Sequence, residues 1–155
     1  MLPEDILSTA RARGLTIACA ESLTGGALAS ALIAVPGASD AVAGGVVAYT
    51  IPVKVSVLGV DAAVIEQYGV VSEEVALAMA RRARELFGAS AGVATTGVAG
   101  PADHGGKAAG TVCVASVGPW GEHAATAVHE GGREAVRAAA VGDALDLLAL
   151  AVGET

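Results

Sequence analysis

One stretch constrains the fold of this 155-residue chain more than any other, and it runs from Ala20 to Gly26. The apolar residues 16–20 predict a short buried strand, and residues 27–34 predict a helix that Pro36 ends. Ser22 therefore lies on a tight strand-to-helix turn, followed by two glycines that let another group approach the backbone closely. A strand that feeds directly into a helix is typical of an α/β protein.

The turn has two interpretations. A hydroxyl beside backbone N–H groups and the positive end of a helix dipole supplies a nucleophile and an anion site, which acyl transfer needs. Alternatively, Ser22 or Thr24 only caps the helix. From this stretch by itself the capping interpretation is favoured, because helix caps are far commoner than nucleophiles.

The order of predicted elements extends the α/β assignment to the whole chain. We expect helices at residues 3–13, 27–34, 52–58, 61–68, 72–87 and 133–152, and strands at residues 16–20, 44–49, 91–95, 110–117 and 123–129. Because the last two strands form a hairpin, the sheet is expected to be mixed. The prediction is a single domain over residues 1–155 with three α/β/α layers.

Composition and charge argue against several function classes. A net charge of −7 with 3% aromatic residues argues against nucleic-acid binding, which needs a basic surface and stacking platforms. The first residues are acidic, and no uninterrupted apolar run reaches membrane-spanning length, so we expect a cytoplasmic protein without a membrane segment. The histidines are scattered and two cysteines make no disulfide framework, so we expect no metal site and free thiols.

The chain has seven arginines but only two lysines, Lys54 and Lys107. Since arginine supplies most of the positive charge, a retained lysine hints at a need for a titratable amine. Lys54 lies on a short predicted helix just after Tyr49, and its alternative role is a solvated surface charge. Polar residues that follow different strands of such a sheet meet at one edge, so Ser22, Tyr49 and Thr96 are expected to converge.

Two further regions each leave two alternatives open. The glycine-rich residues 96–101 at a strand end form either a cradle for phosphate or ribose, or a connector. Arg133 and Arg137 lie one turn apart at the start of the last helix, where they oppose the helix dipole. They pair either with a neighbouring acid such as Glu130 or with a ligand phosphate, and the sequence alone slightly favours the acid.

Together these segments resemble one family, the CinA C-terminal domain family, which includes nicotinamide mononucleotide deamidases. The matching motifs cover almost the whole chain, at residues 20–26, 35–37, 44–49, 54, 58–60, 69–72, 79–80, 96–101, 110–112, 133 and 137. The resemblance implies a three-layer fold and hydrolysis of the carboxamide of nicotinamide mononucleotide, releasing ammonia. It also implies that no metal or other cofactor is needed and that the protein is a homo-oligomer.

The resemblance also assigns chemical roles. It implies that Ser22 is the nucleophile and Lys54 the activating base, because a lysine of lowered pKa can deprotonate a serine. Tyr49 would relay the proton or orient Lys54. The turn that contains Thr24, Gly25 and Gly26 would bind substrate and hold the oxyanion through its N–H groups.

At the nucleotide end, the resemblance assigns substrate contacts to Thr96, Gly97, Gly100 and Arg137. We expect Arg137 to neutralise the phosphate. Two residues depart from the family pattern: Ile51 replaces a residue that is often polar, and Asp103 stands where glycine is common. These changes keep open a non-catalytic nucleotide-binding or regulatory module. A hydrolase for a different amide or ester is a third interpretation.

Overall fold

The structure, a computed structural model, describes residues 1–153. Its centre is a five-stranded sheet in the order β2-β1-β3-β4-β5. The strands are β1 (Ile17–Glu21), β2 (Val42–Val47), β3 (Ala91–Gly97), β4 (Thr111–Gly118) and β5 (Gly121–Val128). Strands β2, β1 and β3 run parallel, whereas β3–β4 and β4–β5 pair antiparallel, which confirms the mixed sheet.

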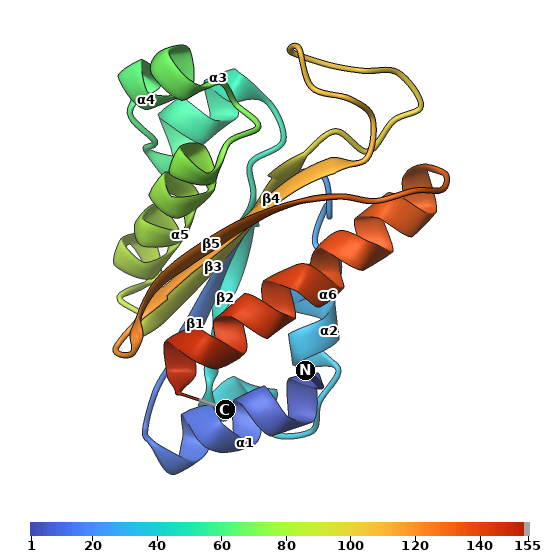
Figure 1. Cartoon of the computed structure of the whole chain (residues 1–155). Coiled ribbons are helices and arrows are strands. Elements are labelled where there is room, and N and C mark those ends of the chain that lie inside the picture. Colours follow the sequence, from blue (N-terminus) through green and yellow to red (C-terminus); the bar gives the residue numbers. More distant parts are fainter. Residues whose placement is uncertain (154–155) are drawn as a thin grey trace.

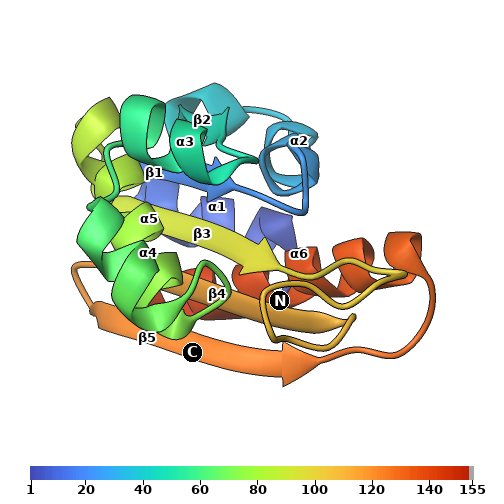
Figure 2. The ribbon, with the colours of Figure 1, turned by 90° about the horizontal axis from the view of Figure 1, so that it is seen from above.

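Helices cover both faces of this sheet (Figures 1 and 2). On one face lie α1 (Pro3–Ala12), α2 (Ala27–Ile33) and α6 (Arg133–Val152). On the other lie α3 (Ile51–Val53), the π-helical turn η2 (Lys54–Leu58), α4 (Ala62–Tyr68) and α5 (Glu73–Phe87), and a 3₁₀ turn η1 (Ala38–Asp40) precedes β2. The predicted three-layer α/β/α arrangement is therefore confirmed.

Each face of the sheet has its own apolar core. Alternate residues of β1 serve opposite cores: Ile17 and Cys19 face α1, α2 and α6, while Ala18 and Ala20 face α5. Small residues let the layers approach closely. A Cβ placed on Gly92 of β3 would lie 2.0 Å from the Ala80 carbonyl oxygen of α5, so only glycine fits there.

The parallel strands end at one edge of the sheet, and three connecting segments leave from that edge. The turn 22–26 follows β1, the segment 48–54 follows β2, and the long loop 98–110 follows β3. Figure 2 shows this edge with α3 and the 98–110 loop beside it. Crevices beyond the carboxyl ends of parallel strands are the usual sites of α/β proteins.

Candidate active site

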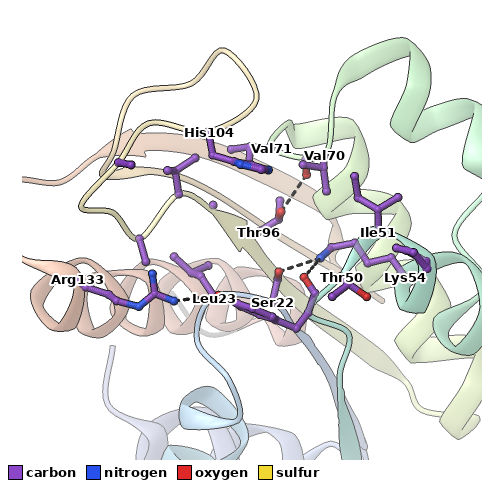
Figure 3. Close-up of a pocket in the computed structure, with 16 residues that line it drawn as sticks. Ser22, Leu23, Thr50, Ile51, Lys54, Val70, Val71, Thr96, His104 and Arg133 are labelled. Atoms are coloured by element: carbon purple, nitrogen blue, oxygen red, sulfur yellow. Dashed lines mark hydrogen bonds between the residues drawn. The ribbon is translucent and has the colours of Figure 1, made fainter.

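A pocket of about 500 Å³ opens at this edge of the sheet (Figure 3). Residues from all three connecting segments line it, including Ser22, Tyr49, Lys54 and His104, and Thr96 lines it from the end of β3. The structure therefore brings Ser22, Tyr49 and Thr96 together in one pocket, as expected. Leu23, Ile51, Val70, Val71 and Val98 supply apolar lining, while Arg133 and His104 add polar groups.

Ser22 and Lys54 are in direct contact within the pocket. The Lys54 Nζ atom lies 2.8 Å from Ser22 Oγ, and Nζ also donates to the carbonyl oxygens of Ala48 at 2.8 Å and Tyr49 at 3.2 Å. The Lys54 side chain is only 1% exposed, and no carboxylate pairs with it within residues 1–153. The alternative of a solvated surface charge is therefore wrong.

Burial lowers the pKa of Lys54 from its ordinary value of 10.5 to about 8. A neutral amine has two N–H donors and one lone pair. Because the Ala48 and Tyr49 carbonyls accept from two donors, the lone pair of neutral Lys54 is left for the Ser22 hydroxyl. The arrangement can therefore take a proton from Ser22.

The local chain path explains how a lysine becomes buried here. Lys54 opens the π-helical turn η2, where its N–H donates to the Thr50 carbonyl at 2.9 Å and its carbonyl accepts from Val60 N–H at 2.9 Å. Leu58 on the same turn is fully buried against the α5 core. Single π-helical turns inside helices are often found at functional sites.

The Ser22 turn is fixed to the neighbouring strand β3. Ser22 N–H donates to the Thr95 carbonyl at 3.1 Å, and the Thr24 and Thr95 hydroxyls are 2.8 Å apart. The N-cap of α2 is Gly26, with φ of 101° and no side-chain capping bond. The interpretation of Ser22 or Thr24 as the helix cap is therefore wrong.

The first turn of α2 is occupied by Glu21, the residue that precedes the serine. Its carboxylate is 1% exposed and accepts from the N–H groups of Gly26, Leu28 and Ala29 at 2.9–3.1 Å. We expected the N-terminus of this helix to be open to an external anion. Instead, the chain's own carboxylate fills it, because Glu21 points back over the turn.

The two arginines of α6 have different partners. Arg137 donates from Nε to the Leu23 carbonyl at 2.8 Å and from Nη2 to the Thr24 carbonyl at 3.2 Å, and it does not line the pocket. Arg133 does line it, donating to the Gly100 carbonyl at 2.8 Å and to the Tyr49 hydroxyl at 2.9 Å. Neither pairs with an acid in residues 1–153, so the slightly favoured alternative, a neighbouring acid such as Glu130, is wrong.

Tyr49 contributes to the site in an unexpected way. Its main-chain carbonyl orients Lys54, while its half-exposed side chain turns its hydroxyl to Arg133. Within the described part of the chain, the Tyr49 hydroxyl and Lys54 form no hydrogen bond with each other. The structure therefore supports orientation of Lys54 through the main chain and offers no proton relay through the phenol.

The other predicted site residues divide into lining and supporting positions. Thr96 and Gly97 line the pocket, and Thr96 donates to the Val70 carbonyl at 2.9 Å. A Cβ on Gly97 would lie 2.8 Å from the Thr111 carbonyl oxygen, so this glycine permits close strand packing. Thr24, Gly25, Gly26 and Gly100 lie outside the lining and shape the backbone around it.

The two departures from the family pattern differ in consequence. Ile51 lines the pocket and extends its apolar wall. Asp103 accepts from Ala109 N–H at 2.8 Å within its own loop and is absent from the pocket lining. His104 lies in the lining, and sequence analysis missed it because it belongs to no matching motif.

Comparison with known proteins identifies the family. The family model described as the CinA C-terminal domain matches residues 1–152. The chain belongs to the CinA C-terminal domain family. A CinA-like protein from Anaeromyxobacter sp. strain K is 47% identical over 97% of this chain, which spans 37% of that relative's length.

Solved structures of the CinA superfamily share the fold over nearly the whole chain. The crystal structure of the competence-damaged protein (CinA) superfamily protein from Enterobacter cloacae has a TM-score of 0.93 at 31% identity, covering 98% of this chain and 90% of that one. The corresponding protein from Escherichia coli has a TM-score of 0.89 at 34% identity, with coverage of 97% and 90%.

Two further features of residues 1–153 concern metal binding and membrane crossing. No cluster of three or more histidine, cysteine or acidic side chains with the arrangement of a metal site occurs among them. No helix in the same range combines the length and apolar character needed to cross a membrane.

Proposed function

We propose that this CinA-family domain is an amidohydrolase that converts nicotinamide mononucleotide to nicotinate mononucleotide and ammonia by a Ser–Lys mechanism. The observation that carries the proposal is the 2.8 Å contact between Ser22 Oγ and the buried amine of Lys54. A serine hydroxyl is a weak nucleophile until a neighbouring base takes its proton, and Lys54 is placed to do so.

The reaction follows from this contact. Neutral Lys54 takes the Ser22 proton as Oγ attacks the carboxamide carbon. The tetrahedral intermediate then collapses, the C–N bond breaks, and protonated Lys54 gives its proton to the leaving ammonia. Water, deprotonated by the same amine, hydrolyses the ester to release the carboxylate and restore the serine.

The pocket suits a ring joined to an anion. Leu23, Ile51 and Val98 offer apolar surface to a pyridine ring, and Arg133 lies on the pocket with donors for a phosphate. We therefore assign the phosphate contact to Arg133, because Arg133 lines the pocket whereas Arg137 lies outside the lining and binds the carbonyls of Leu23 and Thr24. A carboxylate facing the phosphate would oppose binding, but Asp103 accepts a hydrogen bond within its own loop and does not line the pocket.

The test is ammonia release from nicotinamide mononucleotide, measured with and without chelator. We expect Ser22→Ala to lower turnover by about 10³-fold or more, while Ser30→Ala, an exposed change on α2, leaves turnover unaltered. Loss of activity in chelator, or full activity of Ser22→Ala, would contradict the mechanism. Binding of the nucleotide without turnover by the wild-type protein would instead favour the non-catalytic binding module.

The resemblance also leads us to propose a cytoplasmic homo-oligomer that takes a small nucleotide as its substrate. Light scattering coupled to size-exclusion chromatography would measure the oligomeric state, and a monomer at assay concentration would contradict this part of the proposal.

A further inference from the structure

A second hollow, of about 360 Å³, lies beside the active pocket, between helix α4 and the tip of the 98–110 loop. The two spaces adjoin, because four residues line both of them: Ile51, Val70, Val71 and His104. The floor of the second hollow is apolar and includes the buried side chains of Ile65 and Val71. None of the reaction steps proposed above uses this space.

The tip of the 98–110 loop is a tight hairpin. His104 N–H donates to the Lys107 carbonyl at 3.0 Å, and Lys107 N–H donates to the His104 carbonyl at 2.9 Å. Gly105 and Gly106 between them have φ of 58° and 76°, and a two-residue turn of type I′ requires positive φ at both positions. Because directly paired residues of an antiparallel ladder project to the same face, His104 and Lys107 lie together against the second hollow, which both line.

The second hollow lies on the leaving-group side of Ser22. In the proposed reaction Lys54 gives its proton to the departing nitrogen, so this nitrogen must face Lys54. Ile51, which lines both spaces, comes about one helical turn before Lys54 in the chain. Figure 3 shows Arg133 and Lys54 on opposite sides of Ser22, with Ile51 on the Lys54 side. The phosphate contact and the second hollow are therefore at opposite ends of the site.

Ammonia is too small a leaving group to need this space. A water-sized molecule takes about 30 Å³ of liquid volume, whereas the second hollow measures about 360 Å³. A group as large as a phenyl ring suits the volume and the floor, since Ile65, Val70 and Tyr68 offer aliphatic and aromatic surface. The exposed side chains of Glu66 and Lys107 add one charge of each sign, so the lining does not favour a charged substituent over a neutral one.

We propose that the second hollow is a leaving-group subsite, and that the protein hydrolyses secondary carboxamides with an apolar group on the nitrogen as well as the primary amide. The proposal rests on acyl chemistry at Ser22, as put forward above. With an N-benzyl amide, Ser22 Oγ bonds to the carbonyl carbon and the C–N bond breaks. The nitrogen takes the proton held by Lys54 and leaves as benzylamine. Water then hydrolyses the ester and releases the same acid that the primary amide gives.

The experiment measures kcat/KM for nicotinamide mononucleotide and for its N-benzyl amide, by chromatography of the nicotinate mononucleotide that both release. We expect the two values to lie within about 10-fold of each other, with both reactions lost in Ser22→Ala. A site closed on the amine side would have no room for the benzyl group and would lose about 100-fold or more. A loss of that size in the wild-type protein would overturn the inference.

Glu66→Trp tests where the benzyl group is held. Glu66 is exposed on α4 and lines the second hollow but not the active pocket, so an indole at this position fills the subsite. The kcat/KM for the benzyl amide, relative to the primary amide, should fall about 10-fold or more. Glu4→Trp is the matched control, because it makes the same change on the exposed first turn of α1, and it should keep the wild-type ratio.

An unchanged ratio in Glu66→Trp would overturn the inference, as would an equal fall in Glu4→Trp. If Glu66→Trp does not fold by circular dichroism, Lys107→Trp takes its place under the same criteria. Lys107 is also exposed, and it lines the second hollow from the hairpin without lining the active pocket.

Two esters separate this inference from the proposed nucleotide substrate. The methyl and benzyl esters of nicotinic acid carry the ring without a phosphate, and esters are attacked by a serine more readily than amides are. Ser22 Oγ bonds to the ester carbon, the C–O bond breaks, and methanol or benzyl alcohol leaves with the proton from Lys54. The kcat/KM for the benzyl ester relative to the methyl ester should again fall about 10-fold or more in Glu66→Trp and stay unchanged in Glu4→Trp.

This ester pattern without hydrolysis of nicotinamide mononucleotide would reject the proposed substrate and support the leaving-group subsite. Ester hydrolysis with the same ratio in wild type and Glu66→Trp would overturn the subsite. If no Ser22-dependent hydrolysis of either amide or either ester is found, the proposed function and this inference are both wrong.

Discussion

The pocket is built from two kinds of chain. The turn 22–26 is largely buried and is held from two sides by charged side chains, Glu21 on the α2 side and Arg137 on the α6 side. The loop 98–110 is exposed over residues 101–108 and is held mainly by its own contacts, Asp103 to Ala109 and His104 to Lys107. Both follow parallel strands of the same sheet.

Under the proposed function, this difference predicts that the turn and the loop have separate roles. Chemistry at Ser22 needs atoms placed within a fraction of an ångström, and that requires a turn with few alternative conformations. Recognition of a nucleotide tolerates more movement, since an exposed loop can adjust around its ligand. Changes to the turn should therefore alter rate and stability, whereas changes near the loop should alter substrate affinity.

The largest effect is expected at Lys54, which connects the turn to the chemistry. Lys54→Met removes the proposed base, and we expect turnover to fall by about 10²–10⁴-fold. Lys54→Arg should be equally inactive, because arginine stays protonated at neutral pH. Steady-state ammonia release measures both, and substantial activity in Lys54→Arg would contradict a lysine base.

The pH dependence of turnover and of stability gives a second test of Lys54. With a pKa of about 8, Lys54 is mostly protonated below pH 8, so wild-type turnover should rise as pH increases toward and through that value. In the unfolded chain the pKa is near 10.5, so between about pH 8 and pH 10.5 the unfolded state binds more protons. The free energy of unfolding should rise across this window by about 3 kcal/mol at most, and Lys54→Met should lack the rise.

A change at Glu21 tests how much stability the turn depends on. Glu21→Ala leaves three N–H groups at the start of α2 without their acceptor, and we expect a loss of about 3 kcal/mol in the free energy of unfolding. Urea unfolding measures the loss. Glu21→Gln keeps one acceptor oxygen and should cost less, whereas equal stability of all three proteins would show that the turn does not depend on this carboxylate.

The sequence was sufficient to predict the strand–turn–helix around Ser22 and the three-layer α/β/α fold. Hydrophobic runs fix the strands, and strand ends in such sheets meet at one edge, which placed Ser22, Tyr49 and Thr96 together. The buried contact of Lys54 was suggested only by the scarcity of lysine and by resemblance. Its burial depends on the π-helical turn, which no local sequence pattern predicts.

What the sequence could not supply was the direction of long charged side chains. Glu21 ends a buried strand, and nothing in its neighbours indicates that it folds back onto α2. Arg133 and Arg137 lie one turn apart on α6, yet one lies on the pocket and the other binds the Ser22 turn. That difference depends on where α6 crosses the sheet, a tertiary property.

Arg133 tests the recognition side of the comparison. Arg133→Gln removes a cation from the pocket, so we expect KM for nicotinamide mononucleotide to rise about 10-fold with little change in kcat. The comparison becomes sharper if Arg137→Gln gives the opposite pattern in the same assay. A fall in kcat alone for Arg133→Gln would place both arginines on the catalytic side and remove the division between turn and loop.

The smallest effect is expected within the loop itself. Asp103→Ala removes one hydrogen bond on an exposed segment, so the free energy of unfolding should change by less than about 1 kcal/mol. The loop should become easier to open, which predicts faster hydrogen exchange at the Ala109 amide and a KM raised by about 2- to 3-fold. Asp103→Asn keeps an acceptor oxygen and should behave like wild type. If Asp103→Ala instead lowered kcat and left KM unchanged, the loop would have to hold reacting groups as tightly as the turn does.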